Sequence, residues 1–371
     1  MPKPLPRVLQ HWISPPAEAS NRRERSTSHN SISSIDESNQ SKMDDSPLTS
    51  EAQPDRTDFG HRPVLYHEIL DYLQPQQRGR YVDGTLGTGG HAWGILQVSS
   101  PHSLLLGLDV DPQAIKLATE RLASYGARAV IIQDSYAHLL ERLAALKWDM
   151  VDGILLDLGA SSIQFDTPDR GFSFRADAPL DMRFDPSNPM RADDLVNTLP
   201  EVELADLIFR YGEEHHARQI ARAIVNARPI HTTVKLADVV SDTIRSKSSR
   251  QASRHIPHLH PATRTFRALR IAVNRELEAL ESVLPQAASA LAPSGRMAII
   301  SFHSLEDRIV KQFFRRESRD CLCPPRQPVC TCGHKAILVE ITRRPVRPSQ
   351  AEVEHNPRAR SARLRVAEKI G

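Results

Sequence analysis

Between about residues 59 and 165, short apolar runs alternate with segments of helical periodicity. The apolar runs are typical of strands buried on both faces of a sheet, and they cover residues 79–82, 104–108, 129–132 and 151–156. Apolar residues three and four positions apart predict helices over residues 64–73, 112–124 and 137–146. Strands and helices that alternate at this spacing predict a doubly wound, mostly parallel α/β sheet.

After Gln164 the pattern becomes helical, and strand character returns only near the C-terminus. Helical periodicity without an apolar strand run extends over residues 166–265, with the best helices at 200–211, 213–227 and 234–245. One long amphipathic helix, 265–291, then precedes a strand at 296–302, and further apolar runs at 336–342 and 362–367 predict an antiparallel edge of the same sheet. We therefore predict an α/β domain in two parts, 59–165 and 266–371, with an inserted helical domain at 166–265.

Composition narrows the class of protein. Residues 1–58 are rich in Ser, Pro, Asp and Arg and have no apolar period, so we expect a disordered N-terminal tail. The whole chain is 40% hydrophobic and 25% charged, with no membrane-length apolar run and no secretory signal at residues 1–16. All four cysteines lie within residues 321–332, which excludes a disulfide framework for the fold. A cytoplasmic protein without a membrane partner fits these features best.

A glycine cluster, Asp83-Gly-Thr-Leu-Gly-Thr-Gly-Gly-His91, follows the first predicted strand. Glycines at such a turn let the backbone approach a ligand closely. Asp109 ends the next predicted strand, 20 residues beyond Gly89, where a carboxylate can accept both hydroxyls of an adenosine ribose. Together these residues favour a nucleoside cofactor over a purely structural turn.

Two classes of cofactor compete for this loop. Residues 87–92 fit the dinucleotide pattern G-x-G-x-x-A, so a nicotinamide-dependent dehydrogenase is one interpretation. However, Asp83 stands directly before the glycines, and its charge would repel a pyrophosphate and attract an ammonium group. The expected ligand is therefore S-adenosylmethionine.

A second polar segment, Asp152-Gly-Ile-Leu-Leu-Asp-Leu-Gly-Ala-Ser-Ser-Ile-Gln164, contains the end of the fourth predicted strand. Asp157 ends that strand, at the sheet edge where doubly wound folds place their active sites. A carboxylate that accepts a hydrogen bond from an exocyclic amine, such as cytosine N4, would make the amine a better nucleophile and receive its proton. Asp157 is thus the candidate catalytic residue, with a strand-end cap or a cofactor contact as the alternative role.

Over about residues 60–371 the chain resembles the ribosomal RNA small subunit methyltransferase H family, also called MraW. The resemblance rests on the two segments above and on six others: His61-Arg-Pro-Val-Leu, Arg170-Gly-Phe-Ser-Phe, Pro179-Leu-Asp-Met-Arg, His260-Pro-Ala-Thr-Arg-Thr-Phe, Ser301-Phe-His-Ser-Leu-Glu-Asp-Arg and Asn356-Pro-Arg-Ala-Arg-Ser. It implies a class I methyltransferase fold with a helical insertion. It also implies methyl transfer from S-adenosylmethionine to N4 of a cytidine in the decoding region of small-subunit (16S) ribosomal RNA, with the small subunit as the expected partner.

The family's cofactor contacts carry over residue by residue. They fall on Gly89, Gly90, His91, Asp109, Tyr136, Asp157 and Gln164. Tyr136 stands where the family usually has Phe, so an aromatic face against the adenine is kept.

Two basic stretches fit an RNA partner, although one such stretch alone is usually a solvated face. Residues 245–270 contain no acid, and arginines recur between residues 343 and 365. We predict RNA contacts at Arg254, Arg264, Arg267, Arg358 and Arg360. A non-catalytic RNA-binding assembly protein would explain these stretches but would leave the glycine loop without a role.

Several motifs near the predicted site allow two interpretations. Residues 170–174 and 180–184 interleave Arg with Phe, and they could stack a single-stranded base or pack between the two domains. His303 follows the strand 296–302 and could contact RNA or serve the fold, while Ser304 and Asp307 are predicted to cap the next helix.

The cysteine-rich loop, residues 321–334, contains Cys321-Leu-Cys323 and Cys330-Thr-Cys332-Gly-His334. Four thiolates in a short loop could form a tetrahedral zinc site, with His334 as a spare ligand. Free thiols or a redox pair are the alternatives. The sequence leaves the oligomeric state open, a homodimer included.

Overall fold

The computed structural model describes residues 63–248, 260–327 and 329–371. The predicted tail at residues 1–58 and the predicted RNA contact Arg254 lie outside these ranges. No described helix combines the length and the apolar character needed to cross a membrane.

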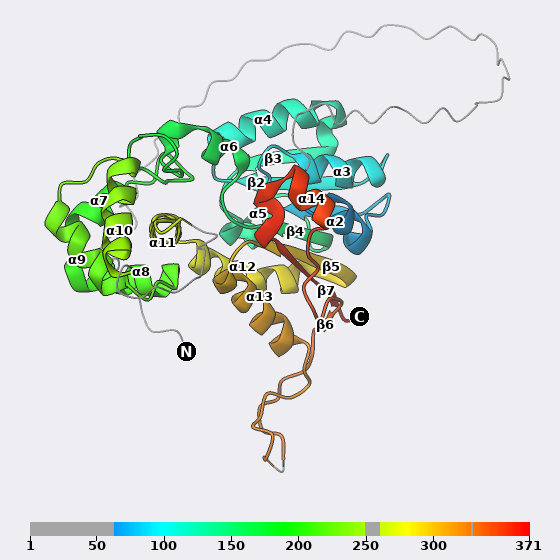
Figure 1. Cartoon of the computed structure of the whole chain (residues 1–371). Helices are drawn as coiled ribbons and strands as arrows, with labels where there is room; N and C mark the ends of the chain where they lie inside the picture. The colour runs from blue at the N-terminus through cyan, green and yellow to red at the C-terminus, as the bar shows by residue number, and fades with distance from the viewer. Residues whose placement is uncertain (1–62, 249–259, 328) are drawn as a thin grey trace, which may run out of the picture. The chain divides into compact units, whose positions relative to one another are not determined.

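A seven-stranded sheet with the order β3-β2-β1-β4-β5-β7-β6 runs through the described chain (Figure 1). Its strands are β1 Arg80–Asp83, β2 Leu104–Asp109, β3 Ala129–Gln133, β4 Val151–Asp157, β5 Leu291–Ser301, β6 Leu338–Glu340 and β7 Arg363–Lys369. Strands β1 to β5 are parallel, and β7 pairs antiparallel with β5 and β6. The predicted fold class, a doubly wound sheet of the class I methyltransferase type, is confirmed.

Helices connect and cover the strands. Those before β4 and just after it are α2 Tyr66–Leu73, α3 Gly90–Val98, α4 Pro112–Leu122, α5 Leu139–Ala145 and α6 Ser162–Asp166. Those that follow up to β5 are α7 Ala192–Thr198, α8 Glu201–Gly212, α9 Ala217–Ala227, α10 Thr233–Ser248, α11 Thr263–Asn274 and α12 Glu276–Ala290. The last two are α13 Ser304–Glu317 and α14 Gln350–His355. Short 3-10 turns are η1 Ala123–Arg128, η2 Tyr136–His138, η3 Pro168–Arg170 and η4 Pro357–Ser361.

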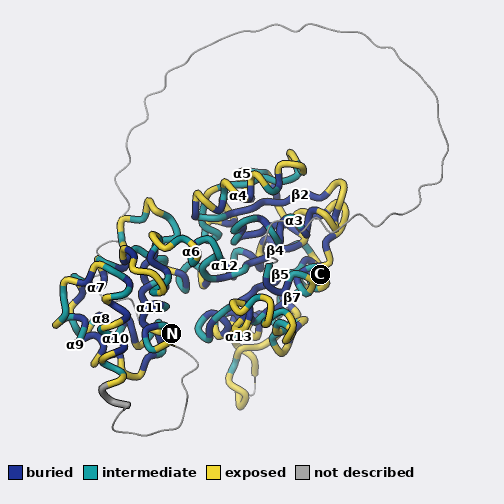
Figure 2. The backbone as a smooth tube through the Cα atoms, turned by 45° about the horizontal axis from the view of Figure 1, so that its top comes forward, coloured by how far each residue is buried: buried dark blue, intermediate teal, exposed yellow. Residues whose placement is uncertain are grey.

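Two apolar cores lie on opposite faces of the sheet, because successive strand residues point to opposite sides. Leu105 and Leu155 pack with α2, α3 and α4, whereas Leu106 and Leu156 pack with α5, α12 and α13. Figure 2 shows the central strands as buried along most of their length. Burial on both faces explains why these strands read as continuous apolar runs in the sequence.

The described residues between β4 and β5 form helices and 3-10 turns. Their strand pairing is limited to one isolated bridge, Pro179 to Thr232. Within this segment α8 packs against α9 and α11, and α10 packs against α9. The helical character expected for this segment is therefore present, while the domain limits at residues 166 and 265 stay a prediction.

The prediction of one long helix over residues 265–291 is wrong. Arg275 adopts a left-handed conformation (φ 51°, ψ 40°) and separates α11 from α12. Asn274 holds the end of α11, since its Nδ2 donates to the Met182 carbonyl at 2.8 Å and its Oδ1 accepts from the Phe184 N–H at 2.7 Å. The apolar period continues across the break, so the sequence pattern did not reveal it.

Candidate active site

Three carboxylates end neighbouring parallel strands, Asp109 on β2, Asp83 on β1 and Asp157 on β4. The carboxyl ends of parallel strands share one edge of the sheet, which is where open α/β sheets bind their ligands. The structure therefore brings together the three acids that the sequence singled out.

The glycine loop joins β1 to α3 above this edge. The Gly87 N–H donates to Asp109 Oδ2 at 2.8 Å, which ties the loop to the neighbouring strand. Gly87 and Gly89 have φ angles of 52° and 77°, in the left-handed region that favours glycine. A Cβ at Gly87 would meet nothing nearer than the Thr85 carbonyl oxygen at 3.9 Å, so the loop is open there.

Gly90 has a packing role of its own. A Cβ at this position would come within 2.5 Å of Pro63 Cγ, so only glycine lets the start of α3 pack against Pro63. The first N–H groups of α3 have no partner within the helix and can serve a ligand. Gly90 would thus contact a cofactor through its backbone.

Asp157 and His91 face each other across the site. Asp157 Oδ2 lies 3.7 Å from His91 Nε2. Asp157 Oδ1 is buried and has no hydrogen-bond partner within the described chain. The Asp157 N–H donates to Thr85 Oγ1 at 2.6 Å, which fixes the end of β4 against the glycine loop. Buried polar atoms without partners are costly and commonly mark a site that a ligand completes.

Burial disfavours the charged forms of the ionisable side chains at this site. It raises the pKa of Asp157 to about 8, with Asp83 and Glu306 adding to the effect. It likewise raises the pKa of Asp83 to about 7 and that of Asp109 to about 6. The pKa of His91 falls to about 4 because burial disfavours its charged form. The site therefore suits a cationic ligand, which would stabilise all three carboxylates.

Asp111 anchors the loop after β4 to the loop after β2. Its buried carboxylate accepts from Arg170 Nη1 at 2.9 Å and from Gln164 Nε2 at 3.0 Å. Gln164 Oε1 also accepts the Ser161 N–H at 2.8 Å, in a capping box at the start of α6. The amide of Gln164, a predicted cofactor contact, is thus held by protein groups.

Tyr136 lies beside the glycine loop. Its Cβ would be 3.1 Å from a Cβ built on Gly84, and the ring packs at the edge of an apolar core. Burial, with the charges of Glu276 and Glu306, raises the pKa of its hydroxyl. Tyr136 is therefore neutral and placed next to the predicted cofactor loop.

A buried charged cluster lies next to Asp157. Arg270 on α11 makes two hydrogen bonds of 2.9 Å to the Glu276 carboxylate on α12. His303 Nε2 lies 3.1 Å from Glu306 Oε1, and Glu306 Oε2 accepts the Phe302 N–H at 2.8 Å. The pKa of Glu306 is low despite its burial, because His303 and Arg270 stabilise its charge. From the sequence, only His303 was placed at this edge. Glu306 and Arg270 stood in a quoted motif and a basic stretch without being assigned to the site, and Glu276 was in no recognised motif.

The residues predicted to cap the N-terminus of α13, Ser304 and Asp307, are not the ones that do so. His303 is the N-cap, and its Nδ1 accepts the Glu306 N–H at 3.4 Å. The Ser304 hydroxyl instead donates to Glu213, and Asp307 accepts from Arg363 and Arg365. Tertiary partners compete for Ser304 and Asp307, so the local capping pattern does not decide their roles.

The arginine–phenylalanine segments pack against each other. Phe172 stacks on Phe184 with ring centroids 5.5 Å apart, and Phe174 lies 4.5 Å from the His260 ring. Arg170 donates to the Phe184 carbonyl at 2.8 Å. Of the two interpretations offered by the sequence, this geometry favours packing for Phe172 and Phe184.

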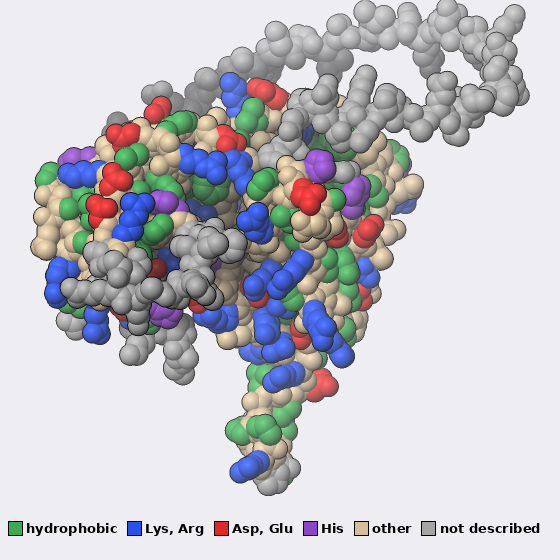
Figure 3. Space-filling model, in the orientation of Figure 1, with side chains coloured by type: hydrophobic (Ala, Val, Ile, Leu, Met, Phe, Trp, Pro, Cys, Tyr) green, Lys and Arg blue, Asp and Glu red, His purple; other side chains and the backbone are tan. Residues whose placement is uncertain are grey.

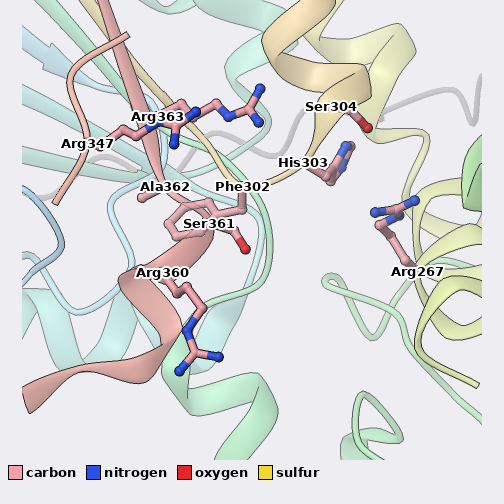
Figure 4. Close-up of a pocket in the computed structure, with 9 residues that line it drawn as sticks. All are labelled: Arg267, Phe302, His303, Ser304, Arg347, Arg360, Ser361, Ala362 and Arg363. Carbon is pink, nitrogen blue, oxygen red and sulfur yellow. The ribbon is translucent and has the colours of Figure 1, made fainter. Parts of the chain in front are cut away.

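A basic pocket opens beside the cluster (Figure 4). It is lined by Arg267, Phe302, His303, Ser304, Arg347, Arg360, Ser361, Ala362 and Arg363. Arg267 projects from α11 toward His303, and the other arginines come from the C-terminal segment. Figure 3 shows Lys and Arg side chains gathered over the same C-terminal elements. The lining contains no acid, so the pocket is suited to an anion such as a phosphate.

Only some of the predicted RNA contacts line this pocket. Arg267 and Arg360 line the pocket, whereas Arg358 pairs with Asp166 and lies over the Phe165 ring. Arg264 lies 3.5 Å from Glu214. Arg347 and Arg363 also line the pocket. Their basic stretch was recognised in the sequence, but these two residues were not selected as RNA contacts.

The chain is similar to known proteins. The chain matches the MraW methylase family over residues 58–370. A ribosomal RNA small subunit methyltransferase H from Dehalococcoides mccartyi is 49% identical over 314 residues, 85% of this chain and 88% of that relative. The protein of the same name from Geotalea uraniireducens is 51% identical over 317 residues, 85% of this chain and 100% of that relative. A solved rRNA methylase from Streptococcus thermophilus is 10% identical, with a TM-score of 0.35 and coverage of 82% of this chain and 94% of that one.

Proposed function

Since this chain belongs to the MraW methylase family, we propose that it transfers a methyl group from S-adenosylmethionine to N4 of a cytidine in the decoding region of small-subunit ribosomal RNA. The observation that carries the proposal is the partnerless Asp157 Oδ1 at the edge where Asp83 and Asp109 also end. Methylation of ribosomal RNA follows from membership of the family. The target atom, N4 of cytidine, and its position in the decoding region are what we propose in addition.

The site fits S-adenosylmethionine by charge. The ligand carries an ammonium, a sulfonium and a carboxylate, so its net charge is positive. A positive charge stabilises the ionised forms of buried carboxyl groups whose pKa values are raised. Asp83 would pair with the ammonium and Asp109 would accept the ribose hydroxyls, with Tyr136 beside the adenine. When bound, the sulfonium supplies an electrophilic methyl group. A dinucleotide would instead bring a pyrophosphate next to Asp83 and Asp157, which disfavours the dehydrogenase alternative.

Asp157 would make cytosine N4 a better nucleophile. The N4 lone pair is delocalised into the ring, so the amine is a poor nucleophile. A hydrogen bond from N4 to Asp157 Oδ1 would localise the lone pair and give the departing proton an acceptor. Burial, together with the charges of Asp83 and Glu306, raises the pKa of Asp157 in the ligand-free protein, so it is a stronger base than an ordinary aspartate.

The decisive experiment uses purified protein, labelled S-adenosylmethionine, and small subunits or naked 16S RNA from cells lacking this gene. The RNA is digested and its nucleosides are separated. We expect label in N4-methylcytidine, with small subunits the better substrate. Label in another nucleoside would keep the methyltransferase but refute the amine chemistry.

Affinity for S-adenosylmethionine is expected to rise between about pH 6 and pH 8. Asp83 and Asp157 must lose protons to face the positive charges of the ligand, and Asp109 must lose one to accept both ribose hydroxyls. Their pKa values in the ligand-free protein are about 7, 8 and 6, respectively. Each proton released contributes up to about tenfold in affinity per pH unit. Titration calorimetry in two buffers of different ionisation enthalpy measures both the affinity and the number of protons released.

Asp83→Asn provides the control for this pH dependence. The variant should bind the ligand more weakly and with a flatter pH profile. Because the folded pKa of Asp83 lies above its ordinary value of 3.8, ligand-free stability should fall as pH rises from about 4 to about 7. The variant should therefore melt at a higher temperature than the wild type at pH 8. An equal or lower melting temperature would contradict the raised pKa.

We propose that the basic pocket binds phosphates of the RNA beside the target nucleotide. Arg347 and Arg360 are exposed and have no ion-pair partner among the residues described. The charge of Arg363 is partly neutralised, because its Nη1 donates to Asp307 Oδ2 at 2.9 Å. The two unpaired arginines are therefore the best candidates for phosphate contacts.

Replacing Arg347 and Arg360 together by Ala should weaken RNA binding and reduce its salt dependence. The slope of log K against log salt is expected to become shallower by about 1–2, because each lost phosphate contact releases about one counterion fewer. Filter binding at several salt concentrations measures this slope. Arg222→Ala is the matched control, since Arg222 is exposed on α9 and already paired with Glu201. An unchanged slope in the double variant would remove the pocket from the RNA interface.

A further inference from the structure

The loop between α13 and β6 contains all four cysteines of the chain. It projects away from the sheet beyond α13 in Figure 1, and Figure 2 colours it mostly exposed. It lies outside the candidate active site, and methyl transfer assigns it no role.

The four sulfur atoms converge on one point. The recorded Sγ–Sγ distances are 3.4 Å for Cys321–Cys330, 3.6 Å for Cys330–Cys332, 3.9 Å for Cys332–Cys321 and 4.0 Å for Cys323–Cys330. All four Sγ atoms lie within 4.8 Å of one another. A zinc ion with Zn–S bonds of about 2.3 Å would place its sulfurs about 3.8 Å apart at the corners of a tetrahedron. The observed distances lie around this value.

The geometry does not fit disulfides. All four cysteines are free, and the recorded sulfur separations far exceed a covalent S–S bond of about 2.05 Å. The compact arrangement also suits one ion better than a cluster that spreads its thiolates over two irons.

The loop has no apolar core that would explain this convergence. Among its described residues from 319 to 333 none is buried, and Leu322 and Val329 are 41% and 70% exposed. Ordering such a segment costs conformational entropy that only a cross-link can offset here. Backbone N–H groups of Leu322 and Thr331 donate to Cys332 and Cys323 at 3.3 and 3.4 Å, as expected around metal-bound thiolates.

We propose that this loop binds one Zn²⁺ through the thiolates of Cys321, Cys323, Cys330 and Cys332. The four thiols lose their protons on binding, and all four tetrahedral positions are filled by protein, so the site is structural. His334 lies outside the group of four converging ligand atoms, and its Nε2 lies 3.0 Å from the Arg316 carbonyl oxygen. The ion cross-links the loop independently of the methyl-transfer site.

The first test measures metal and thiols in the full chain, purified without a metal-binding tag. We expect about one zinc per chain by mass spectrometry and a colourless protein. With no other cysteines in the chain, thiol titration is unambiguous. Four thiols should react only after a chelator removes the metal, with one zinc released.

Limited trypsin digestion provides a second readout. Arg326 lies between the two cysteine pairs, and cleavage after it should be slow with zinc and at least tenfold faster after chelation. Cys321→Ser and Cys332→Ser should lose the zinc and the protection. Val329→Ser, an exposed substitution in the same loop, should keep both. Wild-type protein with four freely reactive thiols that takes up no stoichiometric zinc would overturn the proposal, as would two disulfides or bound iron.

Discussion

Asp157→Asn protein is expected to transfer methyl groups roughly 100- to 1,000-fold more slowly than the wild type at saturating cofactor and RNA. Asparagine keeps the shape of the side chain and an oxygen that accepts a hydrogen bond, but it does not take up a proton. The loss should therefore fall on the chemical step. Single-turnover assays with labelled cofactor measure that step directly. At cofactor concentrations well below saturation, the wild-type rate should rise toward pH 8 as Asp157 ionises, and the variant rate should lose this part of the pH dependence.

Asp152→Asn is the matched control for this experiment. Asp152 lies at the opposite end of the same strand, where it is exposed and accepts the Arg80 N–H at 2.7 Å. Its replacement should leave the single-turnover rate within about twofold of the wild type, because it is far from the carboxyl edge of the sheet. An Asp157→Asn protein with an unchanged rate would exclude Asp157 as the proton acceptor. Loss of cofactor binding with a normal chemical step would leave Asp157 as a cofactor contact only.

Arg270→Met is expected to destabilise the protein by about 3–5 kcal/mol, since it leaves Glu276 buried without its partner. The Glu276 carboxylate is 6% exposed, and Glu306 lies in the same cluster, so the lost cation stabilised more than one charge. Urea unfolding followed by circular dichroism measures the change in the free energy of unfolding.

The double variant Arg270→Met, Glu276→Leu separates the cost of an unpaired charge from a general packing defect. Buried ion pairs can often be replaced by apolar residues at little cost, so the double variant should recover most of the lost stability. His303 remains to stabilise Glu306 in this variant, at 3.1 Å. If the double variant is as unstable as Arg270→Met alone, the loss comes from packing and not from the uncompensated carboxylate.

The sheet and its cofactor edge could be predicted from the sequence because their signals are local. Strands buried on both faces read as apolar runs, and Asp83, Asp109 and Asp157 each end such a run. Parallel strands bring their carboxyl ends to one edge, so the convergence of these acids follows from the fold class alone. Gln164 was selected only through the family resemblance, and its amide contacts Asp111 and Ser161.

The break between α11 and α12 shows where local signals fail. The contacts of Asn274 with residues 182 and 184 come from a segment about 90 residues earlier in the chain. In a continuous helix, residues six apart lie on different faces, so Arg270 and Glu276 would not meet. The left-handed Arg275 turns the chain so that they do.

The sequence by itself determined the doubly wound sheet, its antiparallel edge and the three acids beneath the glycine loop, because strand burial and strand ends are encoded in neighbouring residues. Only the tertiary structure decided the charged cluster around Glu276, the capping of α13 by His303 and the arginines that share one pocket. Those features join side chains from distant segments, and a buried charge selects its partner by geometry in the folded chain, which no periodicity records.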